Sequence, residues 1–279
     1  MPAEPSGLET LAIELKTLSK RIAEARTPGL SSSRLRRVRN AIVEAYVEIK
    51  RTIDDLDPIK HPGFVFDPAN PAIVGRFIGI TMVAQPRKPL ARDDRFYGSG
   101  VYALYYKGDY PAYQQIAGKE HPIYVGKADP MDQASKTAIE QGDRLSARLS
   151  DHRRTIRKAT TTLSVEDFEY RALVVQTGWQ TSAENYLIHL FRPIWNNEVG
   201  ICFGFGKHGD APQTRANLRS PWDTLHHGRD WAHRDPTMKD ARSQQRILAD
   251  IYSHFQQNPP LTSIDQILGL FLDEMRAVS

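Results

Sequence analysis

The sequence predicts an α/β fold of the α+β kind, in which a small sheet is flanked by helices and preceded by an N-terminal helical hairpin. Two patterns predict it. Apolar residues recur at helical spacing in residues 1–57 and again near the C-terminus, whereas the middle of the chain alternates short β-rich runs with helical ones. With 279 residues, 40% hydrophobic and 25% charged, the chain can bury one full core and a second small domain.

Residues 1–57 are expected to form the hairpin. Apolar side chains recur at steps of three and four over residues 8–25, and Ser6 with Glu9 has the spacing of a capping box. After a Thr-Pro-Gly break, a second apolar stripe runs over residues 35–56. Four arginines at the start of the second helix are more typical of a solvated surface than of a phosphate contact, so we assign the hairpin no chemistry.

Residues 58–95 are punctuated by prolines around short apolar runs and are expected to form a connecting segment with one helix. The main domain is expected to span residues 96–279, in the order β-β-α-β-α followed by a polar, loop-rich stretch and two helices. The polar stretch is long enough to need a function. The expected elements are strands at 100–107 and 122–126, a helix at 133–158, a strand at 168–176, a helix at 181–191, polar loops at 197–245 and helices within 241–278.

Bulk properties exclude several classes of protein. No apolar stretch reaches the roughly 18 residues of a membrane span, and the start lacks the pattern of a signal peptide, so a cytoplasmic protein without membrane contact is expected. The single cysteine, Cys202, has no partner for a disulfide or a zinc site. The net charge is only +4, but residues 144–158 hold six basic side chains against one acid. This segment predicts a local positive face.

Six polar residues form the candidate catalytic set. Two are tyrosines in neighbouring strands, and an arginine and a histidine lie four residues apart, hence on one helix face. A glutamate lies on the apolar stripe of its helix, where an unpaired carboxylate is costly unless a cation or a donor meets it. The set is Tyr102, Tyr124, Arg148, His152, Glu184 and Asn196.

Each of these residues also has an ordinary structural interpretation. Strand tyrosines are commonly core residues, and an arginine with a histidine is typical of a solvated helix face. Glu184 stands three residues after Thr181, which is the spacing of a capping box, and Asn196 is a residue type that caps turns. None is decisive alone, and the joint occurrence of all six in this order favours function.

The combined motifs resemble the GIY-YIG nuclease family, with Gly100-Val101-Tyr102 and Tyr124-Val125-Gly126 in place of the two signature triplets. Within that family the chain is most similar to the restriction enzymes that cut the palindrome CCGCGG, over roughly residues 96–232. The similarity includes Trp222-Asp-Thr-Leu-His226 followed by Gly228-Arg229. Valine replaces both signature isoleucines, a long segment separates the two tyrosines, and His227 stands where those enzymes carry proline.

The resemblance implies a mainly antiparallel GIY-YIG core and a Mg²⁺-dependent type II restriction endonuclease that cuts double-stranded DNA at a palindromic, GC-rich site. In such an enzyme Tyr102 takes the proton from the attacking water, and Glu184 holds the one Mg²⁺ of each active site. Arg148 contacts the scissile phosphate, while Tyr124 and Asn196 orient water, phosphate or side chains by hydrogen bonds. No small-molecule cofactor is expected.

The same resemblance sets expectations for partners. His152 or Lys127 would supply the positive charge that lowers the pKa of Tyr102. A palindrome is read best by a two-fold dimer, so a homodimer is expected, with the N-terminal hairpin as a candidate contributor to its interface. The residues expected to contact DNA are Arg144, Lys207, His208, Arg215, Asn217, Arg219 and Arg229.

Two alternatives stay open. One is a monomeric GIY-YIG nuclease that nicks DNA in repair or in mobile-element homing. The other is a catalytically inactive DNA-binding regulator built on the same scaffold, against which the complete catalytic set argues.

Overall fold

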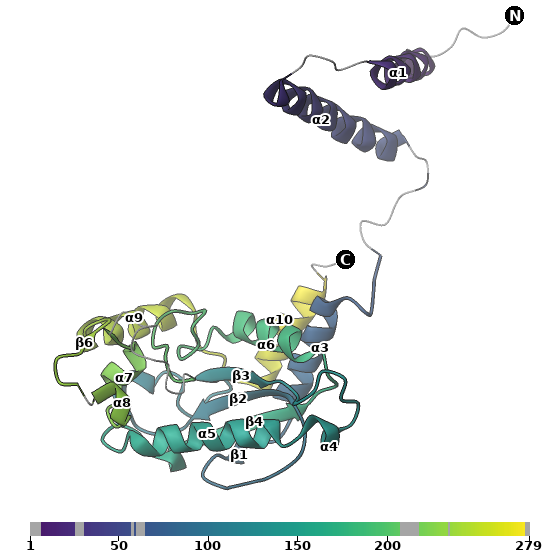
Figure 1. The fold of residues 1–279 in the computed structure, drawn as a ribbon. Helices are drawn as coiled ribbons and strands as arrows, with labels where there is room; N and C mark the ends of the chain where they lie inside the picture. Colours follow the sequence, from purple (N-terminus) through teal and green to yellow (C-terminus); the bar gives the residue numbers. More distant parts are fainter. Residues whose placement is uncertain are drawn as a thin grey trace, which may run out of the picture. The chain divides into compact units, whose positions relative to one another are not determined.

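The structure is a computed structural model that describes residues 7–25, 31–56, 59, 65–206, 218–233 and 235–276. The chain divides into two units, residues 1–63 and 64–279, which are described separately. Figure 1 shows their helices and strands. Among the described residues, no helix combines the length and apolarity needed to cross a membrane.

The first unit contains the two predicted helices, α1 (Gly7–Glu24) and α2 (Ser32–Leu56). Their apolar stripes face each other, and side chains of both helices line a shared groove. Neither helix contains a buried residue. The helix pair is thereby confirmed, while the predicted capping residue Ser6 lies outside the described part of the chain.

The second unit is built on a four-stranded sheet in the order β1-β4-β2-β3, in which every neighbouring pair is antiparallel. All seven residues of the central strand β2 are buried, as expected for a strand covered on both faces. β3 is an edge strand, so one side of its backbone lacks a strand partner. The strands are β1 (Lys88–Pro89), β2 (Gly100–Tyr106), β3 (Tyr124–Ala128) and β4 (Phe168–Val174).

Helices cover the two faces of this sheet (Figure 1). On one face, here the α5 face, α5 (Arg144–Lys158) packs against side chains that include Tyr102. On the other, the α6 face, α3 (Pro71–Val83) and α6 (Gln180–Phe191) pack against side chains that include Val101. Since side chains alternate along a strand, successive residues of β2 serve the two layers in turn.

Short elements and two longer helices complete the second unit. β5 and β6 form a small parallel pair. These elements are η1 (Pro111–Tyr113), α4 (Ala138–Gln141), η2 (Val165–Asp167), β5 (Leu218–Arg219), α7 (Pro221–Leu225), α8 (Asp230–His233), β6 (Lys239–Asp240), α9 (Gln244–Gln257) and α10 (Ile264–Arg276).

The predicted order β-β-α-β-α is confirmed, with two differences. The single helix expected at 133–158 is interrupted, because Gly142 adopts a positive φ of 78° and ends α4 before α5 begins. The segment 58–95 contains the one helix expected there, α3, which packs along α6, and its β1 in addition joins the sheet. Its proline-rich sequence resembled a linker because the apolar run of α3 is short and flanked by breakers.

Candidate active site

Tyr102 lies in the middle of β2 and has no solvent-exposed surface. Its hydroxyl forms a 2.6 Å hydrogen bond with Nε2 of His152, which projects from α5. The neighbouring strand places Gly126 directly opposite Tyr102. A Cβ at that glycine would lie 2.5 Å from the Tyr102 hydroxyl, so the glycine of the second signature triplet makes room for the phenol of the first.

Aromatic rings surround the His152 imidazole. The Tyr124 ring meets it edge-on with centroids 5.2 Å apart, and the Phe205 ring stacks on it with centroids 4.6 Å apart and an interplanar angle of 18°. The Tyr102 and Tyr124 rings are themselves 6.2 Å apart. His152 is fully buried, and the rings of Tyr102, Tyr124 and Phe205 all contact its imidazole.

Arg148 lies one helical turn before His152 on α5 and supplies the positive charge of this cluster. Its guanidinium donates a 3.3 Å hydrogen bond to the carbonyl of Gly206. Burial raises the pKa of Tyr102 well above its ordinary value, and the charge of Arg148 acts in the lowering direction. Burial likewise raises the pKa of Tyr124, again against the charge of Arg148. Both phenols are therefore neutral in this structure.

Glu184, near the start of α6, reaches the same region from the other face of the sheet. Burial raises the pKa of its carboxyl to about 7. The charge of Lys127 and a hydrogen bond from the Lys127 backbone lower this pKa, while Glu198 and Asp129 raise it. The carboxyl is thus poised between its protonated and ionised forms near neutral pH.

The free edge of β3 brings the two faces together. Asn196 accepts a 3.0 Å hydrogen bond from the Val125 N–H and donates a 2.8 Å bond to the Val125 carbonyl. Two residues further along this edge, the Lys127 backbone N–H and ammonium charge both lower the pKa of Glu184. The charge of Glu184 also raises the pKa of Tyr124, which begins the same strand. Tyr102 and Glu184 therefore come from opposite faces and are linked through the edge strand and Tyr124.

These contacts decide between the interpretations offered by the sequence. α6 begins at Gln180 with Trp179 at its cap, so Thr181 is not the cap of a box with Glu184. Asn196 binds a strand edge instead of simply capping a turn.

Lys127 differs from its expected part. Its ammonium group binds the carboxylate of Asp129 at 2.6 Å. The register pairs it with Val101, whose side chain belongs to the α6 face, whereas Tyr102 lies on the α5 face. Lys127 consequently acts on the pKa of Glu184 and not, as expected, on that of Tyr102.

Three of the arginines expected to contact DNA are described, and all make contacts within the chain. Arg144 is exposed on α5 and donates to the carbonyl of Asp129. Arg219 binds Asp240 and the carbonyls of Ala232 and Met238. Arg229 is the third and is treated below. The other four expected contacts lie outside the described residues, namely Lys207, His208, Arg215 and Asn217.

Arg229 is buried and holds the backbone that carries Phe205. It pairs with Asp223 at 2.6 Å and donates to the carbonyls of Gly204 (2.9 Å) and Phe205 (3.4 Å). A Cβ at Gly204 would lie 2.2 Å from the Ser220 hydroxyl, so this segment passes very close to the start of α7. We call residues 204–206 the strap, because they link the Trp222–Arg229 motif to His152 and Arg148.

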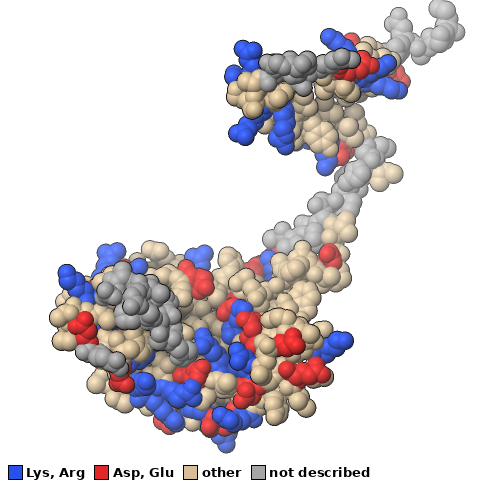
Figure 2. Space-filling model, viewed as in Figure 1, with Lys and Arg blue, Asp and Glu red and all other residues tan. Residues whose placement is uncertain are grey.

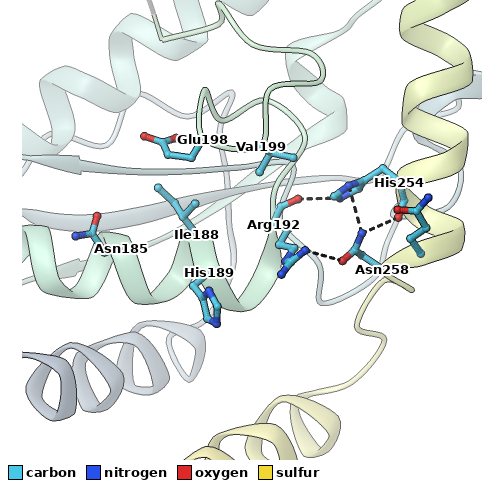
Figure 3. A pocket seen from close by; sticks show the side chains of 9 residues that line it. Asn185, Ile188, His189, Arg192, Glu198, Val199, His254 and Asn258 are labelled. Atoms are coloured by element: carbon cyan, nitrogen blue, oxygen red, sulfur yellow. Dashed lines mark hydrogen bonds between the residues drawn. The ribbon is translucent and has the colours of Figure 1, made fainter. Parts of the chain in front are cut away.

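Sequence reasoning missed two residues of the site. Glu198 raises the pKa of both Glu184 and Tyr124, and its place two residues after Asn196 is the signal that points to it. It lines a cavity of about 580 Å³ over α6, where the backbone of Arg192 accepts a 3.0 Å hydrogen bond from His254 (Figure 3). Phe205 had no such signal, because it lies in a glycine-rich run without periodicity.

The donor set suits a metal ion bound by a single carboxylate. Among the residues that the structure describes, no group of three or more His, Cys, Asp or Glu side chains is arranged to hold a metal. Burial raises the pKa of Glu184, so a cation bound beside this carboxyl would offset the cost of ionising it. Mg²⁺ is content with one carboxylate together with waters and a phosphate, so Glu184 fits it.

Basic side chains line the outer surface of α5. Figure 2 shows Lys and Arg gathered along the edge of the second unit where α5 lies. Arg153 is an exception, because it is buried and paired with Asp93. The exposed members of the group are Arg144, Arg154, Arg157 and Lys158. This surface is suited to the phosphate backbone of a nucleic acid.

A buried tyrosine beside a second tyrosine, an Arg–His helix and a glutamate at the edge of a small antiparallel sheet define the class of GIY-YIG nucleases. The family model described as the Eco29kI GIY-YIG domain matches residues 94–255, more than half of the chain. The chain therefore belongs to this family of restriction endonucleases, which confirms the resemblance and the fold class seen in the sequence. No curated protein matches the chain.

Proposed function

We propose that the chain is a type II restriction endonuclease that hydrolyses double-stranded DNA at a palindromic, GC-rich site such as CCGCGG, with Mg²⁺ and as a homodimer. The observation that carries this proposal is the Tyr102–His152 hydrogen bond beside Arg148, together with Tyr124, whose pKa responds to both Arg148 and Glu184. This cluster lies within the part of the chain that matches the restriction endonuclease family.

Tyr102 is the proposed general base. Burial disfavours a free phenolate at Tyr102. The phenol must therefore give up its own proton at the same time as it accepts the proton of the attacking water. As water attacks phosphorus, its proton moves to the Tyr102 oxygen, and the proton already on that oxygen moves to Nε2 of His152, 2.6 Å away. His152 thus ends the step as an imidazolium.

The other residues act on charge and position. Arg148 would bind the scissile phosphate and stabilise the charge that develops on its oxygens. Glu184 would hold Mg²⁺, which when bound supplies further positive charge at the phosphate and the leaving 3′ oxygen. Asn196 fixes the β3 edge on which Tyr124 and Glu184 depend, so it acts as a positioning residue.

Digestion of a plasmid that carries CCGCGG, with and without Mg²⁺ and with the fragment ends mapped, tests the proposal. We expect linear product with Mg²⁺ only, and defined ends within one palindrome. Persistent single-strand nicks would favour a nicking GIY-YIG nuclease. Intact plasmid that is nevertheless bound by the protein would favour an inactive DNA-binding regulator.

A further inference from the structure

The large apolar side chains of the N-terminal unit are mostly exposed, because two helices alone cannot bury them. The facing stripes of α1 and α2 leave Leu18 51%, Ile42 41% and Tyr46 62% exposed. The other large stripe residues in the same condition are Leu8, Leu11, Leu15, Ile22, Leu35, Val38, Ile53 and Leu56. Exposed apolar patches of this extent mark interaction sites in folded proteins.

A groove between the two helices gives this surface a shape. Its volume is about 470 Å³. Leu15, Leu18 and Ile22 line it from α1, and Val38 and Ile42 from α2. Such a groove accepts the apolar ridge of another amphipathic helix.

We propose that this face joins two copies of the chain, whose hairpins pair into a four-helix bundle. The pairing rests on the proposed homodimer for the number of copies, and it uses residues outside the nuclease domain. Eleven stripe side chains with roughly 80 Å² exposed on each offer about 900 Å² per copy, so a pair would bury about 1,800 Å², within the range of stable interfaces.

The charges of α2 favour a second copy as the occupant. Residues 32–43 hold four arginines and no acid, whereas residues 44–56 hold four acids and two basic residues. A two-fold axis across the middle of α2 runs the helix antiparallel to its copy. Each arginine-rich start then lies beside the acidic end of the other helix, and the two helices attract each other in that orientation.

This arrangement makes a specific geometric claim. If the two α2 helices cross near their midpoints, Leu35 of one copy lies opposite Ile53 of the other, and Ala45 lies close to the axis. The chain has one cysteine, Cys202, which is buried, so an introduced cysteine is the only accessible thiol. Disulfide formation between copies therefore reports the pairing directly.

The first experiment is mild oxidation of full-length cysteine variants. We expect Ala45→Cys to form a covalent dimer, and a mixture of Leu35→Cys and Ile53→Cys to form mixed dimers in preference to either self-dimer. Asn40→Cys, on the opposite face of α2, should form no covalent dimer. Self-dimers of Leu35→Cys alone would indicate parallel helices, and no dimer with any variant would overturn the pairing.

The second experiment needs no assumption about register. Sedimentation velocity over a dilution series should give Ile42→Glu a dimer dissociation constant at least about tenfold higher than the wild type, because a buried charge in the bundle has no partner. Asn40→Glu adds the same charge on the outer face and should leave the constant unchanged. Equal constants for all three proteins would mean that the hairpin serves another occupant, even if DNA cleavage is as proposed.

Discussion

At the scale of single residues, one hydroxyl carries most of the proposed chemistry. Tyr102 is the residue at which the two signature triplets meet, since Gly126 leaves space for its phenol and His152 binds it. The sequence pointed to all of these positions through its resemblance to the GIY-YIG family. It gave no sign of Phe205, because a stacking contact between residues 53 positions apart leaves no local pattern.

Tyr102→Phe removes the proposed proton acceptor and keeps the ring. We expect the single-turnover cleavage rate to fall by about 10² to 10⁴, with DNA binding retained. The matched control is Tyr105→Phe, the same change on the same strand at a buried tyrosine of the α6 face. That control should cut at close to the wild-type rate. Wild-type turnover by Tyr102→Phe would remove the general-base role.

Glu184→Gln tests how the buried carboxyl affects the free energy of unfolding. The folded pKa of about 7 lies above the ordinary value of 4.5. Below pH 4.5 both states are protonated. Between the two values only the unfolded state loses the proton, so the free energy of unfolding falls as pH rises and stays low above pH 7. The glutamine variant escapes this loss.

We therefore expect Glu184→Gln to be more stable than the wild type at pH 8, by on the order of 2 kcal/mol after allowance for the partly exposed carboxyl, and equally stable near pH 4. Thermal unfolding across this pH range measures the difference. Added Mg²⁺ should raise the melting temperature of the wild type at pH 8 and leave the variant unchanged. Glu166→Gln, at an exposed glutamate, serves as the control. Stabilisation of Glu184→Gln by Mg²⁺ would contradict the assignment of Glu184 as the metal ligand.

At the scale of elements, the strap and the β3 edge explain how distant segments share one site. The sequence predicted the strands and helices well, because their periodicities are local. It placed α3 in a connecting segment and joined α4 to α5, since short elements next to proline and glycine carry weak patterns. The Trp222–Arg229 motif was noticed by resemblance. Only the structure shows that its Arg229 holds the backbone of Phe205 through hydrogen bonds to the carbonyls of Gly204 and Phe205.

Phe205→Leu tests the strap without breaking the buried Arg229–Asp223 pair. Loss of the ring stacked on His152 should slow cleavage about tenfold or more and leave DNA affinity unchanged. Phe168→Leu, in the same core but away from His152, should lower stability alone. A wild-type cleavage rate for Phe205→Leu would reduce the strap to a packing element.

At the scale of the whole molecule, the two units have different proposed roles, DNA cleavage for the second and pairing of two copies for the first. The match to the restriction family and every site residue named here lie in the second unit, which has its own sheet and core. The first unit has apolar stripes and no buried residue. The sequence predicted the hairpin and made it a candidate contributor to the dimer interface, but it left that role open, because amphipathic stripes look the same whether they cover their own chain or another copy.

Removal of residues 1–64 should separate these roles. A chain that begins at Val65 is expected to unfold cooperatively and to cut both strands at high enzyme concentration, because the nuclease unit is intact. Without hairpin pairing the dimer of this shorter chain is weaker. A palindrome is then bound more often by a monomer, with one active site, than by a dimer, with two. As the enzyme is diluted, the shorter chain should begin to produce nicked plasmid at a concentration about tenfold higher than the concentration at which the full chain does. Asn40→Glu in the full chain should behave like the wild type. An identical ratio of nicked to linear product for the long and short chains would show that the second unit holds the dimer together alone.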